Sequence, residues 1–197
     1  MVLEALTRLR QICDSPLLLK SEELVENQSV KIQELLRHIT SKTGRHKILV
    51  FSQFVKMLGL IKDELAKLNI DYEYLDGQST SKQREQSINN FQENENLWVF
   101  FISLKAGGVG LNLTAADYVY IVDPWWNPAV ETQAIDRCHR IGQDKKVFAY
   151  RMICTNTVEE KILALQDKTK KIAGDIIQTD ESILKKLDQN DIRELFS

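Results

Sequence analysis

Residues 47–54 read KILVFSQF, and the continuous apolar run Ile48–Phe51 within them predicts a short strand buried on both faces of a sheet. Four more strands are predicted along the chain, at Tyr72–Leu75, Leu97–Ile102, Tyr118–Val122 and Val147–Ile153. Stretches with helical spacing of their apolar residues alternate with these strands, as in Met57–Leu68. Short strands that alternate with helices predict βαβ units and a parallel sheet.

Helices are also predicted on both sides of this central pattern. Residues from Val2 keep helical spacing until Pro16 ends the helix, and a second helix is expected between Ser29 and Gly44. Two pairs have the spacing of a capping box and predict helix starts, namely Thr80 with Gln83 and Thr157 with Glu160. The predicted fold class is therefore α/β, with a parallel sheet flanked by helices and helical attachments at both ends.

The composition limits the classes of protein that this chain can represent. Hydrophobic residues make up 43% and charged residues 27%, with a net charge of −2, so any basic surface for nucleic acid must be local. Cys13, Cys138 and Cys154 are far apart, which fits a reducing compartment and excludes a disulfide framework and a cysteine zinc site; no metal site is predicted. With no apolar run of membrane-spanning length, we expect an intracellular protein with no membrane partner.

The stretch NPAVETQAIDRCHRIGQ, residues 127–143, predicts a helix with Asn127 as its cap and Gly142 as its stop. In such a helix Gln133, Arg137 and Arg140 share one stripe, next to an apolar stripe that must be buried. Two arginines three residues apart repel each other, and an anion such as a phosphate between them removes the repulsion. The alternative is a surface helix whose arginines pair with local carboxylates.

Two loops at strand ends carry unusual residues. The glycines of KAGGVGLNLT, residues 105–114, let backbone N–H groups approach an anion, although a close strand–helix turn explains them equally well. In DPWWNP, residues 123–128, two prolines stiffen the loop, and one tryptophan can fill the core while the other meets a base, a sugar or a partner. Packing alone also accounts for either tryptophan.

The motifs that the chain lacks are informative as well. It contains no P-loop, no DExH or DExD box, no HExxH motif and no GxSxG motif, and its glycines do not have the spacing of a dinucleotide fingerprint. The chain therefore has arginines that could bind a phosphate but lacks the phosphate-binding lysine of a P-loop. This combination indicates one half of a nucleotide site.

Four of these segments resemble one family: ILVFSQF (48–54), YLDGQSTSKQR (74–84), SLKAGGVGLNLTAADYVYIVDPWWNP (103–128) and QAIDRCHRIGQ (133–143). They are similar, in order and spacing, to the second RecA-like lobe of SNF2-family DNA-dependent ATPases, which are superfamily 2 motors. The residues of these segments are more similar to those of bacterial and Rad5/Rad16-like members than to those of the Snf2 remodeller core. The resemblance implies a helical lead-in at 1–44, the RecA-like lobe at 45–156, and a bracing helix with a docking tail at 157–197.

The resemblance also implies the site residues. ATP with Mg would bind between this lobe and an N-terminal RecA-like lobe of the same protein that carries the P-loop. The matching positions imply Arg137 and Arg140 as arginine fingers with Gln133 beside them, and Gly108, Gly110 and Asn112 as nucleotide-facing. The positions implied for double-stranded DNA are Ser52, Gln53, Gly77, Gln78, Ser79, Thr80, Ser103, Lys105 and Trp126.

Our interpretation is the second motor lobe of an ATP-dependent translocase on double-stranded DNA, able to remodel or strip DNA-bound proteins and inactive in isolation. Two alternatives stay open: a protein-interaction module derived from such a motor, and a nucleotide-binding enzyme complete in itself. Both arginines are present, which counts against the first alternative, and the missing P-loop counts against the second.

Overall fold

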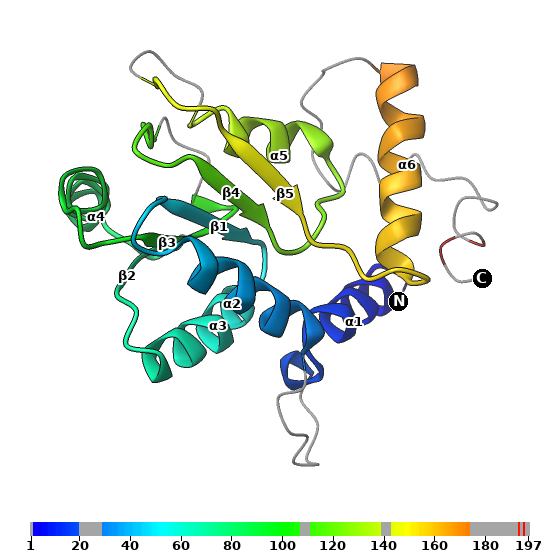
Figure 1. Ribbon diagram of the computed structural model, residues 1–197. Coiled ribbons are helices and arrows are strands. Elements are labelled where there is room, and N and C mark those ends of the chain that lie inside the picture. Colours follow the sequence, from blue (N-terminus) through cyan, green and yellow to red (C-terminus); the bar gives the residue numbers. More distant parts are fainter. Residues whose placement is uncertain are drawn as a thin grey trace.

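The computed structural model of the chain describes residues 2–19, 29–106, 111–138, 143–173, 193 and 195. In this part of the chain, five parallel strands form one sheet with helices on both faces (Figure 1). The strands are β1 (Ile48–Ser52), β2 (Tyr72–Leu75), β3 (Val99–Ser103), β4 (Tyr118–Ile121) and β5 (Phe148–Arg151). The helices are α1 (Val2–Asp14), a 3-10 turn at Pro16–Leu18, α2 (Val30–Lys42), α3 (Val55–Lys67), α4 (Ser81–Glu93), α5 (Pro128–Ile135) and α6 (Val158–Ala173).

The sheet has the strand order β2-β3-β1-β4-β5, and every neighbouring pair is parallel. All five predicted strands are present, with bounds within two residues of the predicted ones. The central strands β1 and β3 are buried along their whole length, as the continuous apolar runs predict, whereas β5 is an exposed edge strand. The prediction of a RecA-like parallel sheet flanked by helices is confirmed.

Because successive side chains of a strand point to opposite faces, the sheet has two hydrophobic cores. On one face Leu49 and Phe51 pack with residues of α4 and α5. On the other face Ile48 and Val50 pack with α2 and α3. Helix α2 belongs to the predicted lead-in 1–44, yet it covers the sheet itself; the domain bounds after residues 44 and 156 stay predictions.

The two helical attachments, α1 and α6, pack against each other beside the sheet (Figure 1). They build a third apolar cluster with the loop after β4, made of Leu6, Trp126, Val158, Ile162 and Leu195. Leu195 lies in the tail that the sequence predicts to dock, and it is one of the two described residues there. None of the described helices has the length and apolarity needed to cross a membrane.

The helix starts agree with the sequence at one capping box and differ at the other. Thr80 and Gln83 form the reciprocal box before α4. Before α6, Thr157 Oγ accepts from the N–H of Glu159 at 3.2 Å, while the Glu160 carboxylate accepts from the N–H of Asn156 at 2.7 Å. The predicted second box is therefore wrong in its pairing, because Glu160 reaches one residue further back.

A buried lysine connects the attachments to the sheet. Lys31 of α2 donates to Asp14 of α1 at 2.8 Å, to Glu159 of α6 at 2.5 Å, and to the carbonyl of Val122 at 2.9 Å. Its side chain is 4% exposed, so three helices and the end of β4 meet at one ammonium group. Burial alone would lower the pKa of Lys31, but the two carboxylates outweigh burial and raise it.

We predict that Lys31→Met lowers the free energy of unfolding by about 3–5 kcal/mol, because it leaves two buried carboxyl groups without their cation. Urea unfolding monitored by circular dichroism measures the loss. The control is Lys67→Met, which removes an exposed pair with Glu64 and should change stability by less than about 1 kcal/mol. Equal, small effects of both substitutions would contradict the role given to Lys31.

Candidate functional site

The predicted site loops leave the carboxyl edge of the sheet, because all five strands run in the same direction. Ser52 at the end of β1 pairs in register with Ser103 at the end of β3, and Leu104 N donates to the Ser52 carbonyl at 2.9 Å. The loops after β2 and β4 start at the same edge. The structure therefore brings together the four loops that the sequence assigns to DNA.

Within this edge, the side chains assigned to DNA differ in exposure. Ser52, Ser103 and Trp126 are buried, at 0%, 2% and 6% exposure. The exposed residues are Gly77, Gln78, Thr80 and Lys105, and the partly exposed ones are Gln53 and Ser79. Ser52 and Ser103 bond to their own loops: Ser52 Oγ accepts from Phe54 N at 3.0 Å, and Ser103 Oγ accepts from Ala106 N at 3.3 Å. In this conformation the buried side chains shape the loops, and the exposed ones are available to a ligand.

The loop after β2 is held by Asp76. Its carboxylate accepts from the N–H of Gln78 at 2.9 Å, and its own N–H donates to Ser79 Oγ at 3.1 Å. Partial burial alone would raise the pKa of Asp76, but the hydrogen bonds from Gln78, Tyr74 and Ser79 lower it. The loop is therefore preformed around an ionised carboxylate, with the amide of Gln78 exposed on it.

The Gly-rich segment is described only at its two ends. Gly108 and Gly110 lie outside the described residues, and so does Arg140. At the exit of the segment, Asn112 is exposed and its carbonyl accepts from Gln92 at 3.2 Å. The next residue, Leu113, donates its N–H to the carbonyl of Arg137 at 3.2 Å. The predicted nucleotide-facing segment and the turn at residues 136–138, which carries Arg137 and is called the arginine turn below, are therefore hydrogen-bonded neighbours.

Helix α5 is shorter than predicted. Asn127 caps it through Ala129 N at 3.0 Å, as expected, but the helix ends at Ile135 and residues 136–138 form a turn. The N–H of Asp136 still donates to the Thr132 carbonyl four residues back, whereas the N–H of Cys138 donates to the Ile135 carbonyl three residues back, which tightens the chain into a turn. Gln133 is exposed whereas Arg137 is 3% exposed, so the predicted common stripe of these two residues is wrong.

Asp123 connects the loops after β1 and β4. Its carboxylate accepts from Ser52 Oγ at 2.9 Å and from the Gln53 N–H at 2.9 Å. Complete burial raises the pKa of Asp123, although the charge of Arg10 and these hydrogen bonds lower it in part. Two loops assigned to DNA are thus joined at a buried carboxyl group.

Arg10 of α1 lies underneath the same loops and is 2% exposed. It donates to Gln53 Oε1 at 3.1 Å and to the carbonyl of Pro124, and its guanidinium lies 5.4 Å from the ring centre of Trp126. Helix α1 therefore supports the side chains of two residues that the resemblance assigns to DNA. A planar guanidinium suits this place because it can bond in its plane and stack on an aromatic face.

Glu131 connects α5 to three other elements. Its fully buried carboxylate accepts from Trp125 N at 2.7 Å, from Arg151 of β5 at 2.5 Å, and from Gln166 of α6 at 3.1 Å. Gln166 also donates to the Trp125 carbonyl. The helix that leads to Arg137 is thereby oriented by the edge strand, by α6 and by the loop after β4.

Sequence reasoning missed the buried polar residues that hold this edge, namely Arg10, Lys31, Asp123, Glu131 and Gln166. One signal in the sequence could have identified Lys31. It is a charged residue in the first turn of a predicted helix, next to Ile32 on the apolar side of that helix. Their partners lie far away in sequence, 128 residues for Lys31 and Glu159, and spacing cannot identify them.

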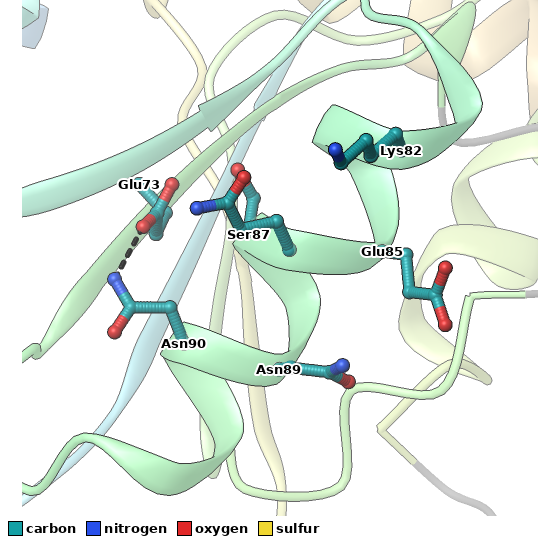
Figure 2. Close-up of a pocket in the computed structure, with 7 residues that line it drawn as sticks. Glu73, Lys82, Glu85, Ser87, Asn89 and Asn90 are labelled. Atoms are coloured by element: carbon teal, nitrogen blue, oxygen red, sulfur yellow. Dashed lines mark hydrogen bonds between the residues drawn. The ribbon is translucent and has the colours of Figure 1, made fainter.

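An open polar hollow of about 900 Å³ lies elsewhere, between β2 and α4. Figure 2 shows Glu73 and Asn90 joined across it by a hydrogen bond, with Lys82, Glu85 and Asn89 on the helix. None of the predicted site residues lines it. Among the described residues, no group of three or more His, Cys, Asp or Glu side chains is arranged to hold a metal ion.

Comparisons with known proteins agree with this architecture. A family model described as the helicase conserved C-terminal domain matches residues 30–142. YwqA of Bacillus subtilis is 40% identical over 202 residues, covering 100% of this chain and 22% of that protein. The ATP-dependent helicase rhp16 of Schizosaccharomyces pombe is 42% identical over 172 residues, covering 86% and 20%, and the DNA repair protein rad5 of Neurospora crassa is 43% identical over 176 residues, covering 87% and 14%.

Solved structures agree as well. The Sulfolobus solfataricus SWI2/SNF2 ATPase C-terminal domain has 32% identity and a TM-score of 0.74, with 98% of this chain and 80% of that chain covered. The core of the Sulfolobus SWI2/SNF2 ATPase in complex with dsDNA has 34% identity and a TM-score of 0.78, with 98% and 41% covered.

The chain therefore belongs to the helicase conserved C-terminal domain family, and within it this chain is a RecA-like C-terminal lobe of the SNF2 family of ATP-dependent helicases. It spans between 14% and 22% of the length of the three relatives named above.

We predict that Glu131→Ala lowers the free energy of unfolding by about 3 kcal/mol, because it leaves the buried N–H donors of Trp125 and Gln166 without this acceptor and breaks the ion pair with Arg151. Glu131→Gln keeps the shape and one acceptor oxygen and should cost less. Glu64→Ala, on the exposed face of α3, is the control, with a loss below about 1 kcal/mol in the same urea titration. If Glu131→Ala lowers the free energy of unfolding no more than this control does, the role given to the Glu131 carboxylate is refuted.

Proposed function

We propose that this lobe is half of a DNA-translocating ATPase. In the longer protein it would place arginine side chains against ATP, with Mg, bound on an N-terminal RecA-like lobe, and it would hold double-stranded DNA through the loops at its carboxyl edge. Movement along DNA would remodel or displace DNA-bound proteins. The similarity to ATP-dependent helicases and to a SWI2/SNF2 core solved with dsDNA supports this proposal.

The observation that carries the proposal is the hydrogen bond from Leu113 to the Arg137 carbonyl, which joins the exit of the Gly-rich segment to the arginine turn. The side chains of Asn112 and Gln133 are exposed near this junction and can donate to phosphate oxygens. Together with an arginine that closure brings to the surface, these amide groups would form one wall of a phosphate site. Bound ATP supplies the γ-phosphoryl group, and this wall would stabilise its negative charge.

The burial of Arg137 restricts its access to ATP. Arg137 is buried, so its approach to a phosphate requires the turn 136–138 to rearrange when the lobes close. We propose that Arg137 contacts the phosphate only after closure, and we assign Arg140 its phosphate contact from its place in the family motif alone.

DNA binding would rely on the exposed members of the carboxyl edge. Lys105 offers a charge, while Gln78 and Thr80 offer polar groups on a loop preformed by Asp76. Groups of this kind bind phosphates and carry no sequence information. Binding should therefore be sensitive to salt and tolerant of DNA sequence.

Coupling between ATP and DNA would follow from shared parts. Asp123 holds the loops after β1 and β4, and the loop after β4 continues directly into α5 and its arginine turn. A displacement of that turn on cleft closure would move the DNA loops with it.

We predict that Arg140→Ala in a protein carrying both lobes reduces DNA-stimulated ATP turnover by about 10³-fold or more and leaves DNA affinity nearly unchanged, because the charge acts on the transferred phosphoryl group. Steady-state hydrolysis and fluorescence anisotropy with labelled duplex DNA measure the two quantities.

Two matched variants separate this role from general effects of charge. Arg45→Ala removes an exposed arginine from the turn before β1, at the opposite edge of the sheet, and should change neither quantity. Lys105→Ala should give the reciprocal pattern, with weaker DNA binding and a shallower salt dependence. Normal turnover by Arg140→Ala would refute the assignment.

A further inference from the structure

Two of the three cysteines meet where α1 ends and the chain enters α6. Cys13 is the last residue but one of α1, and Cys154 lies between β5 and α6, 141 residues away. The Cys154 thiol donates to the Cys13 carbonyl at 3.3 Å, so the two residues lie next to each other. Figure 1 shows the segment from β5 to α6 passing beside α1.

The surroundings make the two thiols unequal. The neighbouring Cys154 thiol lowers the pKa of Cys13 to about 7, and Thr157 and the charge of Lys31 act in the same direction against burial and Glu159. The same contact with Cys13, together with burial, raises the pKa of Cys154. Near neutral pH, Cys13 is therefore more often a thiolate, which is the reactive form, than an ordinary cysteine is, and its neighbour is a protonated thiol.

The pair can be reached from outside. Both cysteines are partly exposed, and Cys154 lines a pocket of about 470 Å³ between α2 and β5, together with Tyr150, Met152 and Thr155. A small oxidant fits in a space of this size.

We propose that Cys13 and Cys154 are a reversible oxidation site that closes to an intramolecular disulfide when a peroxide is present. This inference does not depend on the proposed motor function. It gives a function to two cysteines that are far apart in the sequence and adjacent in the structure.

The chemistry balances in two steps. The Cys13 thiolate attacks one peroxide oxygen, and the S–O bond forms as the O–O bond breaks to give a sulfenic acid. Hydroxide leaves and becomes water by taking up the proton that the Cys13 thiol released to solvent. The Cys154 sulfur then displaces the hydroxyl group, the S–S bond forms as the S–O bond breaks, and a second water leaves with the thiol proton. In total, two thiols and one hydrogen peroxide give one disulfide and two waters.

The bond would fix the position of α1 relative to α6. Both cysteines adjoin the buried lysine cluster, because Asp14 follows Cys13 and the Cys154 N–H donates to Glu159 at 2.9 Å. A disulfide at this point would join α1 covalently to the start of α6, two elements that are otherwise connected through Lys31. It would therefore stabilise the lobe.

The chain carries its own control in Cys138. This residue is 0% exposed, and burial raises the pKa of its thiol to about 12. It should therefore resist both oxidation and alkylation until the protein unfolds.

The experiment treats the purified chain with stoichiometric hydrogen peroxide, blocks free thiols with N-ethylmaleimide after unfolding, and analyses peptides by mass spectrometry. We expect a Cys13–Cys154 linked peptide, a mass loss of about 2 Da in the intact protein and alkylated Cys138. The rate of linkage should rise with pH, with a midpoint near 7. The oxidised protein should melt about 5–10 °C higher, and dithiothreitol should reverse the change.

Cys13→Ser and Cys154→Ser should each abolish the linked peptide and the gain in melting temperature. If either serine variant fails to fold, the linked peptide and the pH profile of the unsubstituted chain still decide the question. The proposal is overturned if peroxide drives Cys13 to sulfinic acid without a link, if Cys138 reacts as fast as Cys13, or if links form only between molecules.

Discussion

The structure depends on how one short segment, residues 122–127 at the carboxyl end of β4, is held by buried polar side chains. Lys31 donates to the carbonyl of Val122, and Arg10 donates to the carbonyl of Pro124. At Trp125, Glu131 accepts from the backbone N–H and Gln166 donates to the backbone carbonyl. The four side chains come from α2, α1, α5 and α6. Such groups are costly to bury and stabilise a structure only when each finds its partner, so the segment specifies where four helices dock on the sheet.

This constraint gives α1 and α6 a role in the lobe, although neither helix packs in the two cores that cover the sheet. Helix α1 supports Gln53 and Trp126 from below through Arg10, and α6 orients α5 through Gln166. The parts that we assign to DNA and to nucleotide are therefore held by the same attachments. The proposed disulfide between Cys13 and Cys154 lies at the contact of those attachments, where a covalent link would act on both.

The fold was predictable because its signals are local. The apolar runs in β1 and β3, the capping residue Thr80 and the breaker Pro16 each act on their own neighbours. The site was predictable only in outline. The turn after Ile135 places the Arg137 carbonyl against the N–H of Leu113, and no periodicity along α5 contains that information. The buried acids and bases that hold the edge likewise have partners fixed by the tertiary fold.

The central claim is that this chain holds one wall of an ATP site and that the other wall belongs to a different lobe. The most direct test is steady-state ATP hydrolysis by the purified 197-residue chain, with and without saturating duplex DNA, beside a protein that carries both lobes. The account predicts that the chain alone hydrolyses ATP no faster than buffer under either condition, while the two-lobe protein shows DNA-stimulated turnover. DNA-stimulated turnover by the chain alone would contradict it.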